Sequence, residues 1–221
     1  MDYEKQAEEL INLMQSDLSP IIQPYQDWID GGLPVENPEV IFLNHHEGAD
    51  PVFASFIIRD AFIQKIGFAI VNSHGIKFFA SLGPILEVGA GSGYISHLIR
   101  HAGGDAIATD IAPNNKQPQL QVEALDAQAA IEKYPGRTIL SSWPSLEQNW
   151  LADAARSLAH GQKLIVIGEG PGGATASDAF FDLIGVELTD ITDELTSEQT
   201  MPLLYSAPAI HDKVSIFERA G

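Results

Sequence analysis

The spacing of apolar residues changes at position 84. From there on, short apolar runs alternate with stretches in which apolar residues recur every three or four positions. This alternation predicts parallel strands joined by crossover helices, a doubly wound, Rossmann-like α/β fold with a mostly parallel sheet. We expect strands at 85–88, 106–109, 138–141, 164–167, 186–191 and 213–218, and helices at 94–101, 123–133, 145–158 and 177–184. The segment 119–125 stays open, because it also suits a short third strand.

The first 83 residues follow a different pattern. Apolar residues in 2–16 have helical spacing, and four prolines between positions 20 and 38 interrupt regular structure. Asp50-Pro51 is a helix-start signal, with a capping carboxylate followed by proline at the first helical position, and the pattern stays helical from 52 to about 70. We therefore expect residues 1–83 to form an N-terminal helical extension on the main domain at 84–221, as one compact unit.

Charge narrows the range of partners. Thirty acidic and 12 basic residues give a formal net charge of −18, which repels phosphate backbones and anionic lipid surfaces. We expect no nucleic-acid and no membrane partner. The chain contains no apolar run of about 18 residues and does not begin like a secretory signal, so a cytoplasmic location is expected. The oligomeric state stays open.

A glycine-rich turn follows the first expected strand of the main domain. Glu87 precedes Gly89, Gly91 and Gly93, and the next strand ends at Asp110, 17 residues after the last glycine. In an open parallel sheet both features reach the carboxyl edge, where the backbone can approach a ligand and a carboxylate can accept hydrogen bonds from ribose hydroxyls. The dinucleotide fingerprint requires a further glycine three positions after the second, where Tyr94 stands, which disfavours a nicotinamide-dependent oxidoreductase.

The run Glu87-Val-Gly89-Ala-Gly91-Ser-Gly93 resembles the first motif of the class I S-adenosylmethionine-dependent methyltransferases. The resemblance implies S-adenosylmethionine as cofactor, with the methionine part held by the glycine turn, the ribose by the acid ending the second strand, and the adenine by residues after the second and third strands. The implied cofactor-binding residues are Glu87, Gly89, Ala90, Gly91, Gly93, Asp110, Ile111, Asp126 and Ala127.

Residues 85–219 also resemble an uncharacterised methyltransferase-like group. Its members carry a Trp-Pro-Pro-Tyr motif after the fourth strand, a Gly-Glu-x-x-Gly-Gly segment after the fifth and a Phe-Phe pair in the next helix. The chain has Ser142-Trp143-Pro144-Ser145, Gly168-Glu169-Gly170-Pro171-Gly172-Gly173 and Phe180-Phe181. The second proline and the tyrosine are absent, which leaves the methyl-accepting atom open.

Three residues at the ends of the fourth and fifth strands are the candidates for catalysis. Ser142 is a polar group at a strand end, Trp143 would wall the pocket, and Glu169 would orient or deprotonate an amine. The alternatives are core packing for Trp143 and a solvated loop acid for Glu169. Thr175-x-x-Asp178 is interpreted as a helix capping box.

No metal site is expected. His97 and His101 are one helical turn apart without an acidic partner, and His45-His46-Glu47 is interpreted as a polar loop. The sequence thus predicts an S-adenosylmethionine-dependent methyltransferase acting on a small-molecule or protein acceptor. The alternative is a binder of the same cofactor without catalysis.

Overall fold

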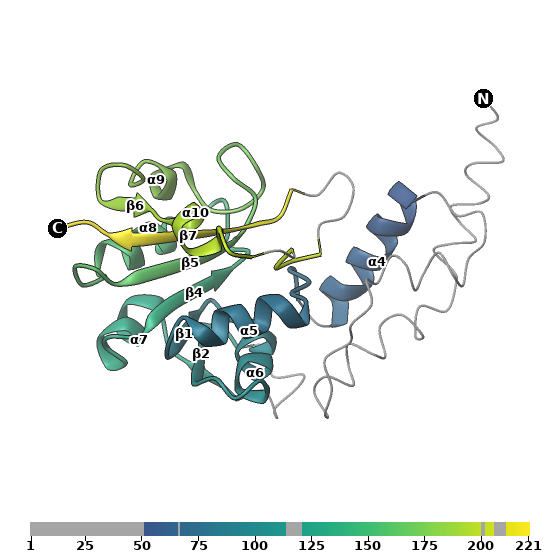
Figure 1. Cartoon of the computed structure of the whole chain (residues 1–221), viewed down its shortest axis with the longest axis horizontal. Coiled ribbons are helices and arrows are strands. Elements are labelled where there is room, and N and C mark those ends of the chain that lie inside the picture. Colours follow the sequence, from purple (N-terminus) through teal and green to yellow (C-terminus); the bar gives the residue numbers. More distant parts are fainter. Residues whose placement is uncertain (1–50, 66, 114–120, 200–201, 206–210) are drawn as a thin grey trace.

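A computed structural model of the chain describes residues 51–65, 67–113, 121–199, 202–205 and 211–221. The expected helix at 2–16 and the histidine-containing segment at 45–47 lie outside these ranges. Within them, seven strands form one sheet flanked by helices on both faces (Figure 1).

The sheet has the strand order β3-β2-β1-β4-β5-β7-β6. The first five strands in this order run parallel, whereas β7 is antiparallel to both of its neighbours. The expected doubly wound, mostly parallel α/β fold is confirmed. The strands are β1 (Ile85–Val88), β2 (Ala106–Asp110), β3 (Val122–Ala124), β4 (Thr138–Ser142), β5 (Lys163–Gly168), β6 (Leu188–Asp190) and β7 (Lys213–Arg219).

Each face of the sheet buries its own apolar core. Alternate residues of a strand point to opposite faces, so Ile85 joins one core whereas Leu86 and Val88 join the other. Helices α5 and α6 cover the first face, and α7, α8 and α9 cover the second. The helices are α4 (Pro51–Lys65), α5 (Ser73–Ser81), α6 (Tyr94–His101), α7 (Ala127–Lys133), α8 (Trp150–Arg156), α9 (Asp178–Phe181) and α10 (Thr192–Thr196).

Helix α4 begins at Pro51, as the proline signal predicts, and ends before Gly67. Figure 1 shows it beyond the edge at which the parallel strands end. Its Phe62 is fully buried in the core that contains Ile76 and Phe79 of α5. Helix α4 therefore shares a core with the face of the sheet that α5 covers.

Several predicted bounds are wrong. The helix expected from 123 begins at Ala127, because 122–124 pair with β2 as β3, the strand alternative for this segment. The helices expected at 145–158 and 177–184 are shorter, covering 150–156 and 178–181. Helices α5 and α10 were not expected.

The capping box is also wrong. Ser177, not Thr175, is the N-cap of α9, and its side chain makes no capping hydrogen bond. The Thr175 hydroxyl instead donates to the backbone carbonyl of Glu169 at 2.9 Å. Thr175 thus holds the loop after β5.

Within the described residues, no helix is both long and apolar enough to cross a membrane.

Candidate functional site

Three glycines shape the turn between β1 and α6. Gly89, Gly91 and Gly93 have φ angles of +64°, +55° and +76°, in the left-handed region that side chains disfavour. A Cβ at Gly89 would lie 2.8 Å from the ring of Trp150, so this position also requires a glycine for space. The backbone N–H of Ala90 donates to the carbonyl of Thr109 at 3.0 Å and ties the turn to β2.

Asp110 ends β2 and fixes the turn from the other side. Its Oδ2 accepts a hydrogen bond from the backbone N–H of Gly91 at 2.8 Å, and its Oδ1 accepts one from Ala112 at 2.7 Å. Each oxygen of an ionised carboxylate can accept a second hydrogen bond. Asp110 can therefore bind two hydroxyls of a ligand while it holds the turn.

Glu87 is a buried acid on a buried strand. Its side chain is 2% exposed, and its Oε2 accepts a hydrogen bond at 2.9 Å from the backbone N–H of Ser96, in the first turn of α6. Burial raises its pKa to about 7, against the smaller opposing effect of this hydrogen bond and of Arg100. Near neutral pH the carboxyl group is thus balanced between its charged and neutral forms.

These groups lie around one pocket of about 280 Å³ at the carboxyl edge of the sheet, where ligands of open α/β sheets bind. The walls come from the glycine turn, the ends of β1, β2 and β4, and the segment that follows α4. Seven of the predicted site residues line this pocket: Glu87, Gly89, Ala90, Gly91, Asp110, Ser142 and Trp143. Other lining residues that the sequence did not single out are Ile63, Gly67, Phe68, Ala69, Ser92, Tyr94 and Ile95.

The other predicted residues lie elsewhere. Gly93 is the N-cap of α6, Ile111 is 79% exposed after β2, and Ala127 begins α7. Asp126 is the N-cap of α7, where its Oδ1 accepts from the backbone N–H of Ala129 at 2.9 Å. Glu169 follows β5, and its Oε2 accepts from the N–H of Ala174 at 2.6 Å.

Trp143 stands at the end of β4 in an uncommon backbone conformation. Its φ of +53° is unfavourable for a bulky residue, and such strained conformations are most common at active and ligand-binding sites. Its backbone N–H donates to the carbonyl of Ile167 at 2.8 Å, which holds it beside β5. Its indole stacks on Phe68 at 5.4 Å between ring centroids, with an interplanar angle of 17°.

Two residues that the sequence analysis missed hold the indole of Trp143. Its Nε1–H donates to Oδ1 of Asp212 at 3.1 Å, and Cζ of Arg59 lies 4.2 Å from the ring centroid. Burial raises the pKa of Asp212, although the bond from Trp143 and the charge of Arg59 oppose this shift. Asp212 is near Trp143 because β7 is antiparallel, which places the residue before Lys213 next to the end of β5.

Among the residues that the structure describes, no three His, Asp or Glu side chains are grouped as a metal ion would require.

The strand order with an antiparallel β7 is that of a Rossmann-like sheet. No family model matches the sequence, and no curated protein matches it significantly.

Similar solved structures include methyltransferases of low sequence identity. An S-adenosylmethionine-dependent methyltransferase from Archaeoglobus fulgidus is 11% identical, with a TM-score of 0.42 over 81% of this chain and 99% of its own. The 1,6-didemethyltoxoflavin-N1-methyltransferase of Burkholderia thailandensis is 12% identical, with a TM-score of 0.42 over 78% and 92%. An O-methyltransferase from Thermotoga maritima is 13% identical, with a TM-score of 0.41 over 73% and 71%. Because one fold hosts many activities, function must be argued from the site itself.

Proposed function

We propose that the chain is an S-adenosylmethionine-dependent methyltransferase. The observation that carries this proposal is the meeting of Glu87, the glycine turn and Asp110 in one pocket. A buried acid beside the turn is unfavourable for a pyrophosphate, because two negative charges would face each other in a low dielectric. The same acid is favourable for a ligand that carries an ammonium group.

The residues present fit the two ends of this cofactor. The carboxyl group of Glu87, with a pKa near neutrality, would become charged when an ammonium group lies close to it. Asp110 retains one free acceptor position on each oxygen, which suits two adjacent ribose hydroxyls. Ile111 and Asp126 flank Asp110 on the same edge of the sheet, and we propose that they contact the adenine.

The bound cofactor would supply a methyl group on a sulfonium, which is already a strong electrophile. The protein therefore has to orient an acceptor in line with that group and exclude water. We assign the wall of the pocket to Trp143 and a polar contact with the acceptor to Ser142, since both line it. Glu169, at the end of the neighbouring strand, is proposed to orient or deprotonate an amine.

The acceptor is proposed to be a small molecule or an exposed group of a protein. The formal net charge of −18 opposes nucleic-acid acceptors, because their phosphates would be repelled.

Calorimetric titration with S-adenosylhomocysteine tests the proposal. We expect binding to the full chain and at least about tenfold weaker binding to Asp110→Ala, because charge-assisted hydrogen bonds are lost. Asp105→Ala is the matched control, since it removes an exposed aspartate that pairs with Arg137; its affinity should equal that of the wild type. Binding of a nicotinamide dinucleotide in place of S-adenosylhomocysteine would refute the proposal.

Transfer of a labelled methyl group to a panel of metabolites and proteins then separates enzyme from binder. Cofactor binding with no transfer to any acceptor would favour the non-catalytic alternative. The absence of the motif's second proline and tyrosine after Pro144 is consistent with that alternative.

A further inference from the structure

The pocket extends across three neighbouring strands of the sheet. Asp110 ends β2 and Trp143 directly follows β4, and β1 lies between these two strands. Because neighbouring strands are about 4.8 Å apart, the two ends of the pocket are separated by about 10 Å. The proposed function places the ribose at Asp110 and the methionine part at the glycine turn after β1. The end beside Trp143 is then left for the methyl acceptor.

An aromatic ring is exposed at this end of the pocket. Phe68, in the segment after α4, lines the pocket and is 50% exposed. It stacks on the indole of Trp143, with 5.4 Å between the ring centroids and 17° between the ring planes. The indole covers one face of the Phe68 ring, so the opposite face belongs to its exposed surface. A ligand that covers this apolar face removes it from water and is stabilised by doing so.

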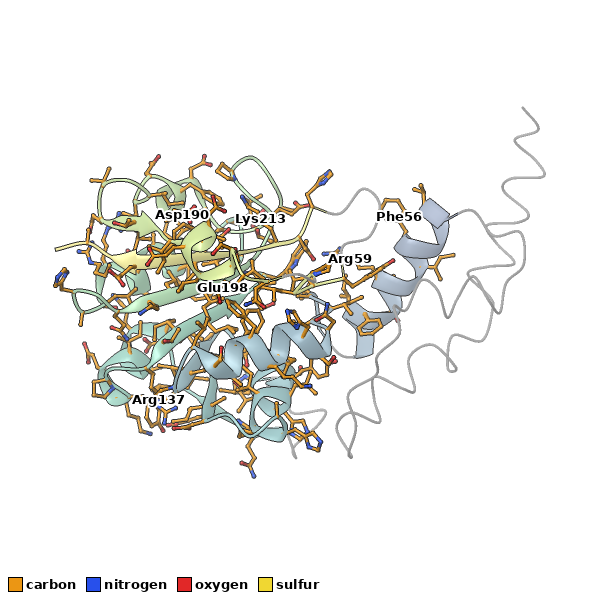
Figure 2. The ribbon with its side chains drawn as sticks, viewed as in Figure 1. Phe56, Arg59, Arg137, Asp190, Glu198 and Lys213 are labelled. Atoms are coloured by element: carbon orange, nitrogen blue, oxygen red, sulfur yellow. The ribbon has the colours of Figure 1, made fainter. Side chains whose placement is uncertain are left out.

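The indole that supports Phe68 is itself fixed by several contacts. Its Nε1–H donates to Oδ1 of Asp212 at 3.1 Å, and Cζ of Arg59 lies 4.2 Å from the ring centroid. Figure 2 shows the Arg59 side chain extending from α4 towards the sheet. The φ of +53° at Trp143 is a strained conformation that persists only where surrounding contacts hold it. The indole therefore keeps Phe68 in one orientation, and the open face of this ring is a preformed flat surface.

The shape and the chemistry of this surface select the acceptor. A planar ring contacts another planar ring over its whole face, and offset stacking favours aromatic partners by about two- to tenfold in affinity beyond the burial of area. A saturated ring of the same size is puckered, so fewer of its atoms reach contact distance. A charged group would lose its hydration against Phe68 and against Ile63 and Ala69, which also line the pocket, without a compensating hydrogen bond from these side chains.

We propose that the methyl acceptor is a small aromatic compound whose planar ring stacks on the open face of Phe68. The proposal rests on the methyltransferase function proposed above and names the substrate class of that site. The strained backbone of Trp143 then has a role, since it holds the indole that orients Phe68.

Fluorine NMR of the full chain labelled with 5-fluorotryptophan tests the inference. The three tryptophans give three resonances, and Trp143→Phe identifies that of Trp143. The labelled chain is saturated with S-adenosylhomocysteine and titrated with 2-naphthamide or with its fully saturated analogue, decahydronaphthalene-2-carboxamide. The two probes share the amide group and have nearly the same size, but only 2-naphthamide is planar.

The variant Phe68→Leu keeps an apolar side chain and removes the flat face. Phe56→Leu is the matched control, because Phe56 is 48% exposed on α4 and is not a lining residue of the pocket. Figure 2 shows Phe56 towards the end of α4 that is farther from the sheet.

We expect the wild type and Phe56→Leu to bind 2-naphthamide about fivefold more tightly than the saturated analogue, with a shift of the Trp143 resonance. Phe68→Leu should reduce this preference to about twofold or less. Phe68→Met replaces it if Phe68→Leu does not fold, and the preference of the wild type tests the inference without any variant.

Equal affinity of the wild type for the two probes, no binding of 2-naphthamide, or binding that leaves the Trp143 resonance in place would overturn the inference. So would a preference that persists in a folded Phe68 variant. Competition between 2-naphthamide and S-adenosylhomocysteine would also overturn it, since the ring would then occupy the place of the cofactor.

The affinity for S-adenosylhomocysteine is measured in parallel by calorimetry. Its absence in the wild type would refute the proposed function and this inference with it. Its presence without a preference for the planar probe would refute only the aromatic acceptor.

Discussion

Glu87 couples the folding of the protein to pH. Its pKa is about 7 in the folded chain and has an ordinary value of 4.5. The folded state therefore holds a proton, between these two values, that the unfolded state has released. By linkage the free energy of unfolding falls as pH rises from about 4.5 through 7, by about 3 kcal/mol in total.

The variant Glu87→Gln tests this linkage, because its amide oxygen can still accept from the N–H of Ser96 but cannot ionise. We expect urea unfolding of the wild type to lose about 3 kcal/mol more than the variant between pH 4.5 and 8. Glu132→Gln, on the exposed face of α7, should follow the wild type. Parallel profiles for wild type and Glu87→Gln would show that burial does not raise this pKa.

The two glycines of the turn that line the pocket should differ in their tolerance of a methyl group. At Gly91 a Cβ would meet nothing within 4 Å, so alanine adds only the strain of a positive φ, about 1 kcal/mol. At Gly89 the same strain is joined by a contact of 2.8 Å with Trp150, which adds about 1–3 kcal/mol. Chemical denaturation of Gly89→Ala and Gly91→Ala measures the difference.

A double-mutant cycle identifies the cause. Combining Gly89→Ala with Trp150→Leu should recover part of the loss, whereas Gly91→Ala with Trp150→Leu should be additive. Equal losses for the two single variants would contradict the overpacking at Gly89.

At the scale of elements, sequence patterns predicted most reliably the strand and the helix on either side of the glycine turn. The bounds of β1 and α6 agree with the prediction, because the glycine turn separates a fully buried apolar run from a helical repeat. The sequence also singled out Glu87, Gly89, Gly91 and Asp110, which line the pocket, since they belong to β1, to β2 and to the turn between β1 and α6.

Other elements depend on tertiary contacts that no local pattern reveals. β3 is three residues long and none of them is fully buried. It is a strand because it pairs with β2, and its sequence contains no apolar run that would predict it. Helix α5 was missed because its start depends on Asn72, whose side chain is held by a hydrogen bond to the carbonyl of Pro202, 130 positions away. Arg59 was overlooked because nothing in the sequence indicates that this charged residue of an apolar helix contacts the indole ring of Trp143.

Asn72 should contribute more to stability than an ordinary helix cap. Its Oδ1 accepts from the N–H of Gly75 at 2.8 Å, and its Nδ2 donates to the carbonyl of Pro202 at 2.7 Å. Asn72→Ala should therefore lower the free energy of unfolding by about 2 kcal/mol, one for the cap and one for the second bond.

The matched control is Asp126→Ala, which removes an exposed cap of α7 whose side chain makes one capping bond. It should cost about 1 kcal/mol. Urea denaturation compares the two variants, and an equal loss would mean that the bond to Pro202 adds nothing.

At the scale of the whole molecule, charge is the dominant property. A formal net charge of −18 makes the compact state repel itself, and salt screens this repulsion. We expect the melting temperature to rise by several degrees, about 3–8 °C, when sodium chloride is raised from about 0.01 to 0.15 M. Sucrose of equal osmolality is the control, and an equal effect of both solutes would argue against charge repulsion.

The reversed direction of β7 determines which parts of the chain reach the edge of the sheet that holds the pocket. In strands that run parallel to β1, the residues at or just after the end of the strand reach the pocket, as Asp110 and Trp143 do. In β7 they are the residues that precede it, and Asp212, directly before β7, accepts a hydrogen bond from Trp143 at this edge. Residues just upstream of the final strand can therefore contribute to the pocket edge, whereas the residues just downstream of it lie at the opposite edge of the sheet.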